Sequence, residues 1–199
     1  HVVCRFAALF PDLARAVVVV EGLGPPAGRH PSDTAQALQA EASRLLQTLG
    51  APYRQRPLPS VAFAADRLVA NNPRLPRERA LELARRGTTV EAGELHWAFD
   101  PRVQSVFLGA DTDASERYWK SVQCPTCVIA GAHAGEYWRS AMPAASSWTG
   151  EFAPGELEAR VALFPDAELV ELPGSGHMVH FDEPEALAER TLDFLRRTL

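Results

Sequence analysis

The sequence predicts an α/β fold that is built on a parallel sheet. Two short apolar runs, at residues 16–20 and 126–130, predict two strands, and residues 168–172, which follow a Phe-Pro-Asp break, are a third strand candidate. Segments with apolar residues at helical spacing separate these runs, so strands alternate with helices along the chain. The chain has 199 residues, of which 46% are hydrophobic, and this is enough to bury the core of one ordinary domain.

The N-terminal segment is expected to form a short buried helix and then a strand. Val3, Phe6 and Phe10 recur at helical spacing, and the proline after Phe10 disfavours helix at the residue before it. The run at residues 16–20 is rich in valine and has no polar alternation, which is typical of a parallel strand covered on both faces. This strand is expected to end at Glu21.

Residues 25–120 are expected to form a helical insertion without strands. This stretch is rich in Ala, Leu and Arg at helical spacing, and several prolines interrupt it. A group of aromatic residues lies in or beside it: Trp97, Phe99, Phe107, Tyr118, Trp119, Tyr137, Trp138 and Trp148. Most of them are expected to form the insertion's own small core, and the others could line an apolar pocket.

The composition argues against several classes of partner. Twenty basic against 25 acidic residues give a net charge of −5, which offers no basic surface for nucleic acid or an anionic membrane. No apolar run approaches the ~20 residues of a membrane-spanning helix. Three cysteines are too few for a disulfide framework, which favours a cytoplasmic location. The first residues include neither Met nor a signal peptide, so we expect the chain to start within a longer protein.

The loop after the strand at residues 168–172 holds the strongest catalytic candidate. Gly174, Ser175 and Gly176 lead directly to His177, which places an imidazole at the carboxyl end of a strand. Open parallel sheets bind their ligands at that end, and histidine is the commonest general acid or base. A lone histidine is more often structural or exposed, so the case for a catalytic role depends on the residues around the loop.

Those residues resemble the C-terminal half of an α/β-hydrolase. The resemblance rests on the run from Gly174 to Met178, the later Glu183-Pro184 pair and the strand from Pro125 to Gly131. The opening resembles the helix and strand that follow the family's nucleophile turn. Further segments resemble the cap of serine hydrolase-like proteins, at residues 22–26, 56–60, 72–75, 86–88 and 97–102. The resemblance covers essentially the whole chain.

The resemblance implies a partial hydrolase core with a helical cap. Residues 1–24 and 121–199 would form the core, without its N-terminal strands, and residues 25–120 would form the cap. The family's nucleophile lies in a GxSxG turn, and this sequence contains no GxSxG. The nucleophile and the oxyanion hole are therefore expected upstream of His1.

Glu21 and Glu136 are the candidates for the acid that orients His177. The family most often places an Asp in the turn at residues 131–135, which here lacks a carboxylate, and Glu136 comes just beyond it. Glu21 matches an alternative position used by some relatives, such as certain haloalkane dehalogenases. We prefer Glu21 because a carboxylate that closes an apolar strand is costly unless it is paired. Its alternative role is to cap a turn.

The remaining ligand-type residues indicate neither a redox centre nor a metal site. Cys124 and Cys127 form a CxxC pair that leads into a strand rather than a helix, so a buried structural role is expected. His133 and His180 belong to no metal-ligand spacing, so no metal is expected. The resemblance implies no dissociable cofactor.

The resemblance implies an esterase-like serine hydrolase that acts on a small, apolar molecule. His177 would be the base and then the acid, at the mouth of a pocket between cap and strand ends, within hydrogen-bond reach of Glu21. Two alternatives stay open. One is a catalytically dead module that binds an apolar ligand, and the other is dehalogenation or epoxide opening by an upstream Asp.

Missing upstream strands would leave apolar surface uncovered. In the family's sheet order the strand at residues 16–20 pairs with an upstream strand, so here it would form an exposed edge, and Val3, Phe6 and Phe10 would face water. Apolar edges promote aggregation. We therefore expect residues 1–199 alone to be inactive and poorly soluble unless a partner chain supplies the missing strands.

Overall fold

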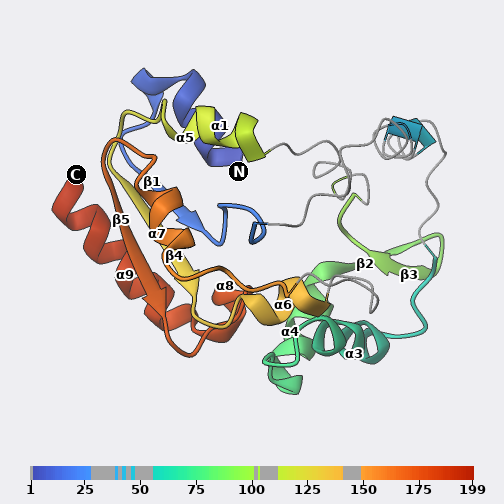
Figure 1. Ribbon diagram of the computed structural model, residues 1–199. Coiled ribbons are helices and arrows are strands. Elements are labelled where there is room, and N and C mark those ends of the chain that lie inside the picture. The colour runs from blue at the N-terminus through green and yellow to red at the C-terminus, as the bar shows by residue number, and fades with distance from the viewer. Residues whose placement is uncertain are drawn as a thin grey trace. The chain divides into compact units, whose positions relative to one another are not determined.

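A three-stranded parallel sheet forms the centre of one of the chain's two compact units (Figure 1). The computed structural model describes residues 2–27, 56–100, 112–140 and 149–199, with isolated residues between them at 39, 42–43, 46–47 and 103. The first unit, called the sheet unit here, comprises His1–His30 and Asp111–Leu199. The second, called the helical unit, comprises Pro31–Ala110.

The strands of the sheet lie in the order β1 (Val17–Val20), β4 (Thr126–Gly131) and β5 (Ala167–Leu172). Both neighbouring pairs are parallel, and their register aligns Val20 with Ile129 and Gly131 with Leu172. The carboxyl ends of the three strands therefore lie at the same edge of the sheet. The predicted α/β class with a parallel sheet is confirmed.

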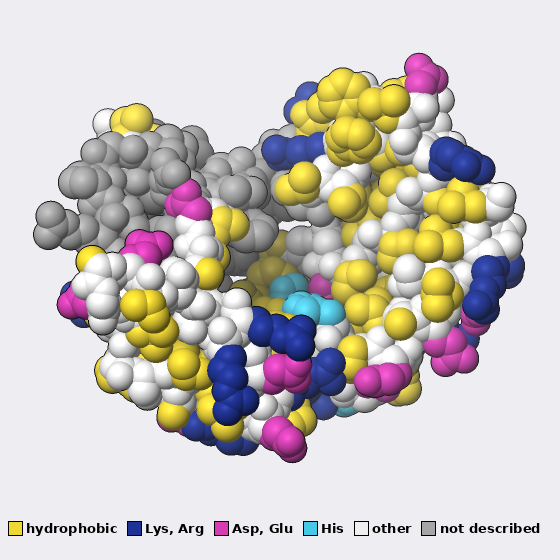
Figure 2. Space-filling model, turned by 180° about the vertical axis from the view of Figure 1, so that it is seen from behind, with side chains coloured by type: hydrophobic (Ala, Val, Ile, Leu, Met, Phe, Trp, Pro, Cys, Tyr) yellow, Lys and Arg dark blue, Asp and Glu magenta, His cyan; other side chains and the backbone are white. Residues whose placement is uncertain are grey.

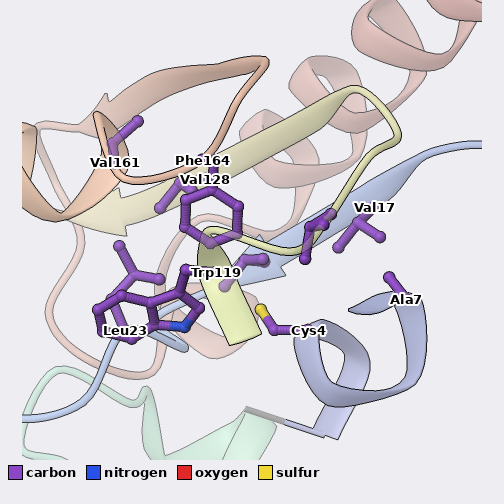
Figure 3. Close-up of a cluster of buried hydrophobic side chains, with 10 residues drawn as sticks. Cys4, Ala7, Val17, Leu23, Trp119, Val128, Val161 and Phe164 are labelled. Atoms are coloured by element: carbon purple, nitrogen blue, oxygen red, sulfur yellow. The ribbon is translucent and has the colours of Figure 1, made fainter. Parts of the chain in front are cut away.

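Helices cover both faces of the sheet (Figure 1). They are α1 (Val2–Leu9), α5 (Thr112–Trp119) and α7 (Glu156–Val161) on one face, and α8 (Val179–Asp182) and α9 (Pro184–Thr198) on the other. Successive residues of a strand point to opposite faces, so Val19 and Val128 pack toward α1 while Ile129 packs toward α9. In the hydrophobic core on the α1 face, Trp119 stacks on Phe164 with ring centroids 6.1 Å apart (Figure 3). Each such side chain, when fully buried, stabilises the fold by about 1.5–3 kcal/mol.

The helical unit contains a β-hairpin that the sequence did not predict. Its described elements are α3 (Val61–Asn71), α4 (Arg77–Gly87), β2 (Thr88–Glu91) and β3 (Glu94–Trp97). Ala92 and Gly93 join the strands with positive φ angles of 51° and 84°, as tight hairpin turns require. The expectation of an insertion without strands was wrong: each strand has only four residues, and its alternation of polar and apolar residues is too short to predict a strand. Leu58 adds an isolated bridge to Leu95.

The two units divide at positions that differ from the expected cap boundaries. The contacts place residues up to 30 and from 111 onward in the sheet unit, whereas the cap was expected to span residues 25–120. Trp119, which was expected near the cap, is buried in the core of the sheet unit. The role of the helical unit as a cap stays a prediction.

Helix α1 and the short 3₁₀ helix η1 (Pro11–Leu13) carry an uncovered apolar surface. Only Cys4 and Ala7 of α1 are buried, whereas Val3, Phe6 and Phe10 are 46%, 47% and 50% exposed. The helix therefore forms as expected, but the residues whose spacing predicted it do not lie in the core. Hydrophobic side chains gather at this end of the sheet unit in Figure 2. Within the described residues β1 is an edge strand, as the sheet order of the resemblance implies.

None of the helices in the described part of the chain is long and apolar enough to cross a membrane.

Replacement of Phe6 and Phe10 together by Ser is expected to reduce self-association. The free energy of unfolding should fall by no more than about 1–2 kcal/mol, because each ring is already about half exposed. Light scattering after gel filtration measures the first effect and urea unfolding the second. As a control, Ala7→Ser changes a buried position of the same helix and should lower stability without improving solubility. Unchanged association of the double variant would show that this surface does not drive it.

Candidate active site

Glu21 and His177 meet at the carboxyl ends of the strands. Nδ1 of His177 lies 2.9 Å from Oε2 of Glu21, and the two side chains are 16% and 8% exposed. The other carboxylate oxygen, Oε1, accepts the backbone N–H of Gly131 at 2.5 Å. Both oxygens of Glu21 are thus engaged. When Nδ1 carries the proton and donates it to Glu21, Nε2 of His177 is left to accept a proton from a substrate or nucleophile.

An unusual backbone conformation aims the Glu21 side chain. Its φ angle is +51°, in the left-handed region that residues with a side chain seldom adopt. Its N–H donates to the carbonyl of Ile129 at 3.0 Å, which continues the ladder between β1 and β4 by one residue. Such strain costs about 1–3 kcal/mol and persists where other contacts hold it, most often at functional sites. Here the two hydrogen bonds of the carboxylate supply those contacts.

Gly131 sets the spacing between the end of β4 and the loop that carries His177. A Cβ at this position would overlap the carbonyl oxygens of Ser175 and Gly176, so the close approach requires glycine. The N–H of His133 also donates to the carbonyl of Ser175, at 2.9 Å. The last residue of β4 therefore contacts Glu21 through its N–H and the histidine loop through its Cα.

Two aromatic rings of helix α6 (Gly135–Ser140) enclose the imidazole. Tyr137 stacks on His177, with ring centroids 4.3 Å apart and planes inclined by 16°. Trp138 meets the same imidazole edge-on at 4.8 Å and 60°. Both aromatics were expected in or beside the insertion, and this contact was not predicted. The sequence feature that could have indicated this contact is their position just after the turn that follows β4, because that turn lies at the carboxyl edge of the sheet.

Glu136, the second candidate acid, lies in helix α6. It occupies the first turn of α6, is exposed and lines a nearby cavity. The hydrogen bond to Nδ1 of His177 is made by Glu21. The preferred candidate is therefore the one that the structure places beside the histidine, while the catalytic roles stay predictions.

A cavity of about 400 Å³ lies beside Glu21, within the sheet unit. The turn after β4, helix α6 and residues 151–158 line it. Its charged lining includes Glu136, Glu158 and the ion pair of Arg139 with Glu151, in which Nη2 and Oε1 are 2.9 Å apart. This lining is more polar than the apolar pocket that the aromatics suggested. The expected pocket between the two units stays a prediction.

A buried arginine holds the segment that follows Glu21. Nη1 of Arg160 donates to the carbonyl of Leu23 at 2.8 Å, and Nη2 donates to Glu156 at 2.7 Å. Oε1 of Glu156 in turn accepts the N–H of Ala27 at 2.7 Å. Burial lowers the pKa of Arg160 from its ordinary value, and the neighbouring Glu156 carboxylate opposes that shift. This pair fixes residues 23–27 on helix α7 and so supports the position of Glu21.

Cys127 of the CxxC pair is buried and Cys124 is half-buried, and their structural role stays a prediction. Cys127 is fully buried in β4, and burial raises the pKa of its thiol to about 11, so it stays protonated at neutral pH. Burial also raises the pKa of Cys124. Among the described residues, no group of three or more His, Cys, Asp or Glu side chains is arranged to hold a metal ion.

Several solved hydrolases are similar to this chain. They include a thioesterase domain from the curacin biosynthetic pathway, with a TM-score of 0.68, 23% identity and coverage of 96% of this chain and 62% of that one. E-2-(acetamidomethylene)succinate hydrolase gives a TM-score of 0.62, 19% identity and coverage of 98% and 62%. An esterase from Mycobacterium tuberculosis gives 0.56, 22% and coverage of 98% and 57%. No family model and no curated protein matches the sequence.

The chain has the α/β-hydrolase fold. It spans about three fifths of the length of the solved structures above. Within this α/β-hydrolase sheet, Glu21 follows the edge strand β1 and His177 follows β5, so the central strand β4 separates the two strands that carry them. Gly131 at the end of β4 bridges that separation through its bond to Glu21.

Gly131→Ala is expected to lower the free energy of unfolding by about 1–3 kcal/mol, because the new methyl group collides with backbone carbonyls that cannot rotate away. Gly87→Ala is the matched control. It adds a methyl group at the end of α4 with 3.8 Å to its nearest neighbour, and should be neutral or slightly stabilising. Urea unfolding of both variants makes the comparison. Equal stability of the two variants would contradict the close approach at Gly131.

Arg160→Met should destabilise the sheet unit by about 3–5 kcal/mol, because it leaves Glu156 and the carbonyl of Leu23 without their buried partner. The control, Arg86→Met, removes an exposed pair with Glu82 and should cost less than about 1 kcal/mol. Thermal unfolding followed by circular dichroism distinguishes the two. A loss at Arg160 no larger than that at Arg86 would rule out a role in holding residues 23–27.

Proposed function

We propose that this chain carries the histidine and acid of a serine-type hydrolase that cleaves a carboxylic ester or a similar bond. The observation that supports the proposal is the 2.9 Å hydrogen bond between Nδ1 of His177 and Glu21, located at the carboxyl ends of the strands. Parallel α/β sheets bind ligands at this end. The positive φ angle of Glu21 adds support, because backbone strain of this kind is concentrated at functional sites.

The pair performs general base and then general acid catalysis in this proposal. Nε2 of His177 takes the proton of the nucleophile's hydroxyl as its oxygen attacks the ester carbonyl carbon. Glu21 stabilises the resulting imidazolium and holds the ring in place. His177 then gives the proton to the departing alcohol, which leaves an acyl-enzyme. Water attacks that acyl group by the same route, and release of the acid restores the nucleophile.

The nucleophile and the oxyanion hole come from outside residues 1–199 in this proposal. No GxSxG turn occurs in the sequence, and the chain spans only about three fifths of the similar structures. Two features are compatible with an added upstream segment. The strand β1 has a neighbour on one side only within the described residues, and the adjacent helix α1 exposes Val3 and Phe6.

The substrate in this proposal is a small ester or thioester. The similar structures include a thioesterase domain, an esterase and a further hydrolase. The cavity of about 400 Å³ that Glu21 lines has the size of a small-molecule site, and His177 is not among its described lining residues. The net charge of −5 argues against nucleic acid as a partner.

A catalytically dead binding module is the competing function, because the sequence lacks the nucleophile turn. An upstream Asp nucleophile, as in dehalogenases and epoxide hydrolases, is the other variant. The residue at the nucleophile turn of the natural polypeptide distinguishes the three: Ser supports the proposal, Asp supports the variant, and the absence of both supports the binding module.

In the natural polypeptide that contains these residues, His177→Ala is expected to lower kcat/KM for an activated ester by ~10⁴-fold or more, and Glu21→Gln by ~10³–10⁴-fold. His180→Ala should change it by less than about twofold, because this exposed histidine lies three positions away from the Glu21 contact. Steady-state kinetics on each variant measure the effects. Comparable losses for His177→Ala and His180→Ala would mean that His177 is not the base.

A further inference from the structure

Two successive carboxylates hold the three residues that precede His177. Oε2 of Glu183 accepts the N–H of Gly174 at 2.9 Å and the hydroxyl of Ser175 at 2.7 Å. Oδ2 of Asp182 accepts the N–H of Gly176 at 2.8 Å. Every residue from 174 to 176 is therefore tied to the junction between α8 and α9.

The carboxylates project from a firmly anchored part of the fold. Asp182 is the last residue of α8, whose Val179 is fully buried against the sheet. Glu183 donates its own N–H to the carbonyl of Val179 at 2.9 Å, and its carbonyl accepts the N–H of Leu187 at 2.9 Å. The backbone that carries Glu183 is thus bonded to the helices on both sides, so its side chain is a fixed point for the loop.

Ordinary helix capping does not account for the Glu183 side chain. Glu183 occupies the N-cap position of α9, yet its side chain makes no hydrogen bond to the first turn of that helix. It turns back and bonds to the loop of Gly174 and Ser175 instead. A Cβ at position 174 would lie 2.9 Å from Cδ of Glu183, so the carboxylate packs directly against the glycine.

The loop is therefore held from two opposite sides. On one side, Gly131 packs against the carbonyl groups of Ser175 and Gly176, and His133 bonds to Ser175. On the other side, Glu183 holds the Ser175 hydroxyl, which belongs to a residue with no exposed surface. His177 follows directly, so these contacts limit where its imidazole can stand relative to Glu21.

We propose that Glu183, assisted by Ser175 and Asp182, is a positioning residue that keeps the His177 imidazole within hydrogen-bond distance of Glu21. Only the kinetic part of this proposal rests on the proposed catalytic role of His177. A displacement of about 1 Å in a reacting group can lower a rate ~10²-fold. Loss of Glu183 should therefore act on the chemical step and not on substrate binding.

The kinetic test uses the natural polypeptide with Glu183→Ala, Glu183→Gln and Glu185→Ala. Glu183→Ala should lower kcat ~10–100-fold with KM nearly unchanged, as outer-shell partners of reacting groups do. Glu183→Gln should recover a large part of kcat, because its amide oxygen can still accept from Gly174. Glu185→Ala removes the same charge from an exposed site on the same helix, and should keep normal kinetics.

A second measurement is independent of activity. Proton NMR of the same polypeptide should show a downfield resonance from the Nδ1 proton of His177, which is bonded to Glu21. Glu183→Ala should broaden or remove this resonance, while Glu185→Ala should leave it intact. The kinetic and NMR measurements together separate the two proposals. A normal kcat in His177→Ala would overturn the proposed function, whereas an unperturbed resonance in Glu183→Ala would overturn the positioning role.

Ser175→Ala provides a variant in case Glu183→Ala does not fold. It removes one hydroxyl and leaves the Glu183 carboxylate bonded to Gly174, so a smaller loss of kcat and a weaker NMR change are expected. Urea unfolding gives the folded fraction of each variant. A normal kcat per folded molecule in both Ser175→Ala and Glu183→Ala would assign these residues to stability alone and overturn the proposal.

Discussion

The carboxylate of Glu21 is the point on which the rest of the site depends. It joins His177 and the N–H of Gly131, so it ties together segments that are more than a hundred residues apart in the chain. A carboxylate that is only 8% exposed is tolerated when both oxygens have partners. The close approach at Gly131 brings the histidine loop next to β4, and Arg160 holds the segment that follows Glu21.

The sheet and the need of Glu21 for a partner could be predicted from the sequence because each leaves a local signal, while the role of Glu21 as the catalytic acid stays a prediction. The strands at Val17–Val20 and Thr126–Gly131 are continuous apolar runs, which is what a strand covered on both faces needs. Glu21 became a candidate through the family resemblance, and it could be preferred over Glu136 because a charge that closes an apolar strand requires a partner. The family resemblance supplied the identity of that partner, His177, and no periodicity in the sequence would have done so.

The features that could not be predicted depend on contacts distant in sequence. Tyr137 and His177 are separated by 40 positions, and their stacking depends on the direction in which the chain leaves β4. Trp119 packs in the core of the sheet unit against Phe164, which lies 45 positions later in the sequence. The β2–β3 hairpin was missed because its four-residue strands alternate polar with apolar side chains only briefly, and Ala92-Gly93 is a weak turn signal.

The position of Glu21 at the end of an edge strand links the assembly of the sheet to the chemistry of the site. Neighbouring strands lie about 4.8 Å apart, so a strand added to the open side of β1 would end one strand spacing from Glu21. A side chain at its carboxyl end would then lie beside the acid and histidine. Under the proposed function, completion of the sheet and completion of the catalytic site would be the same event. Hydrolytic activity would thus report on folding, and two separately produced fragments could regain it when they associate.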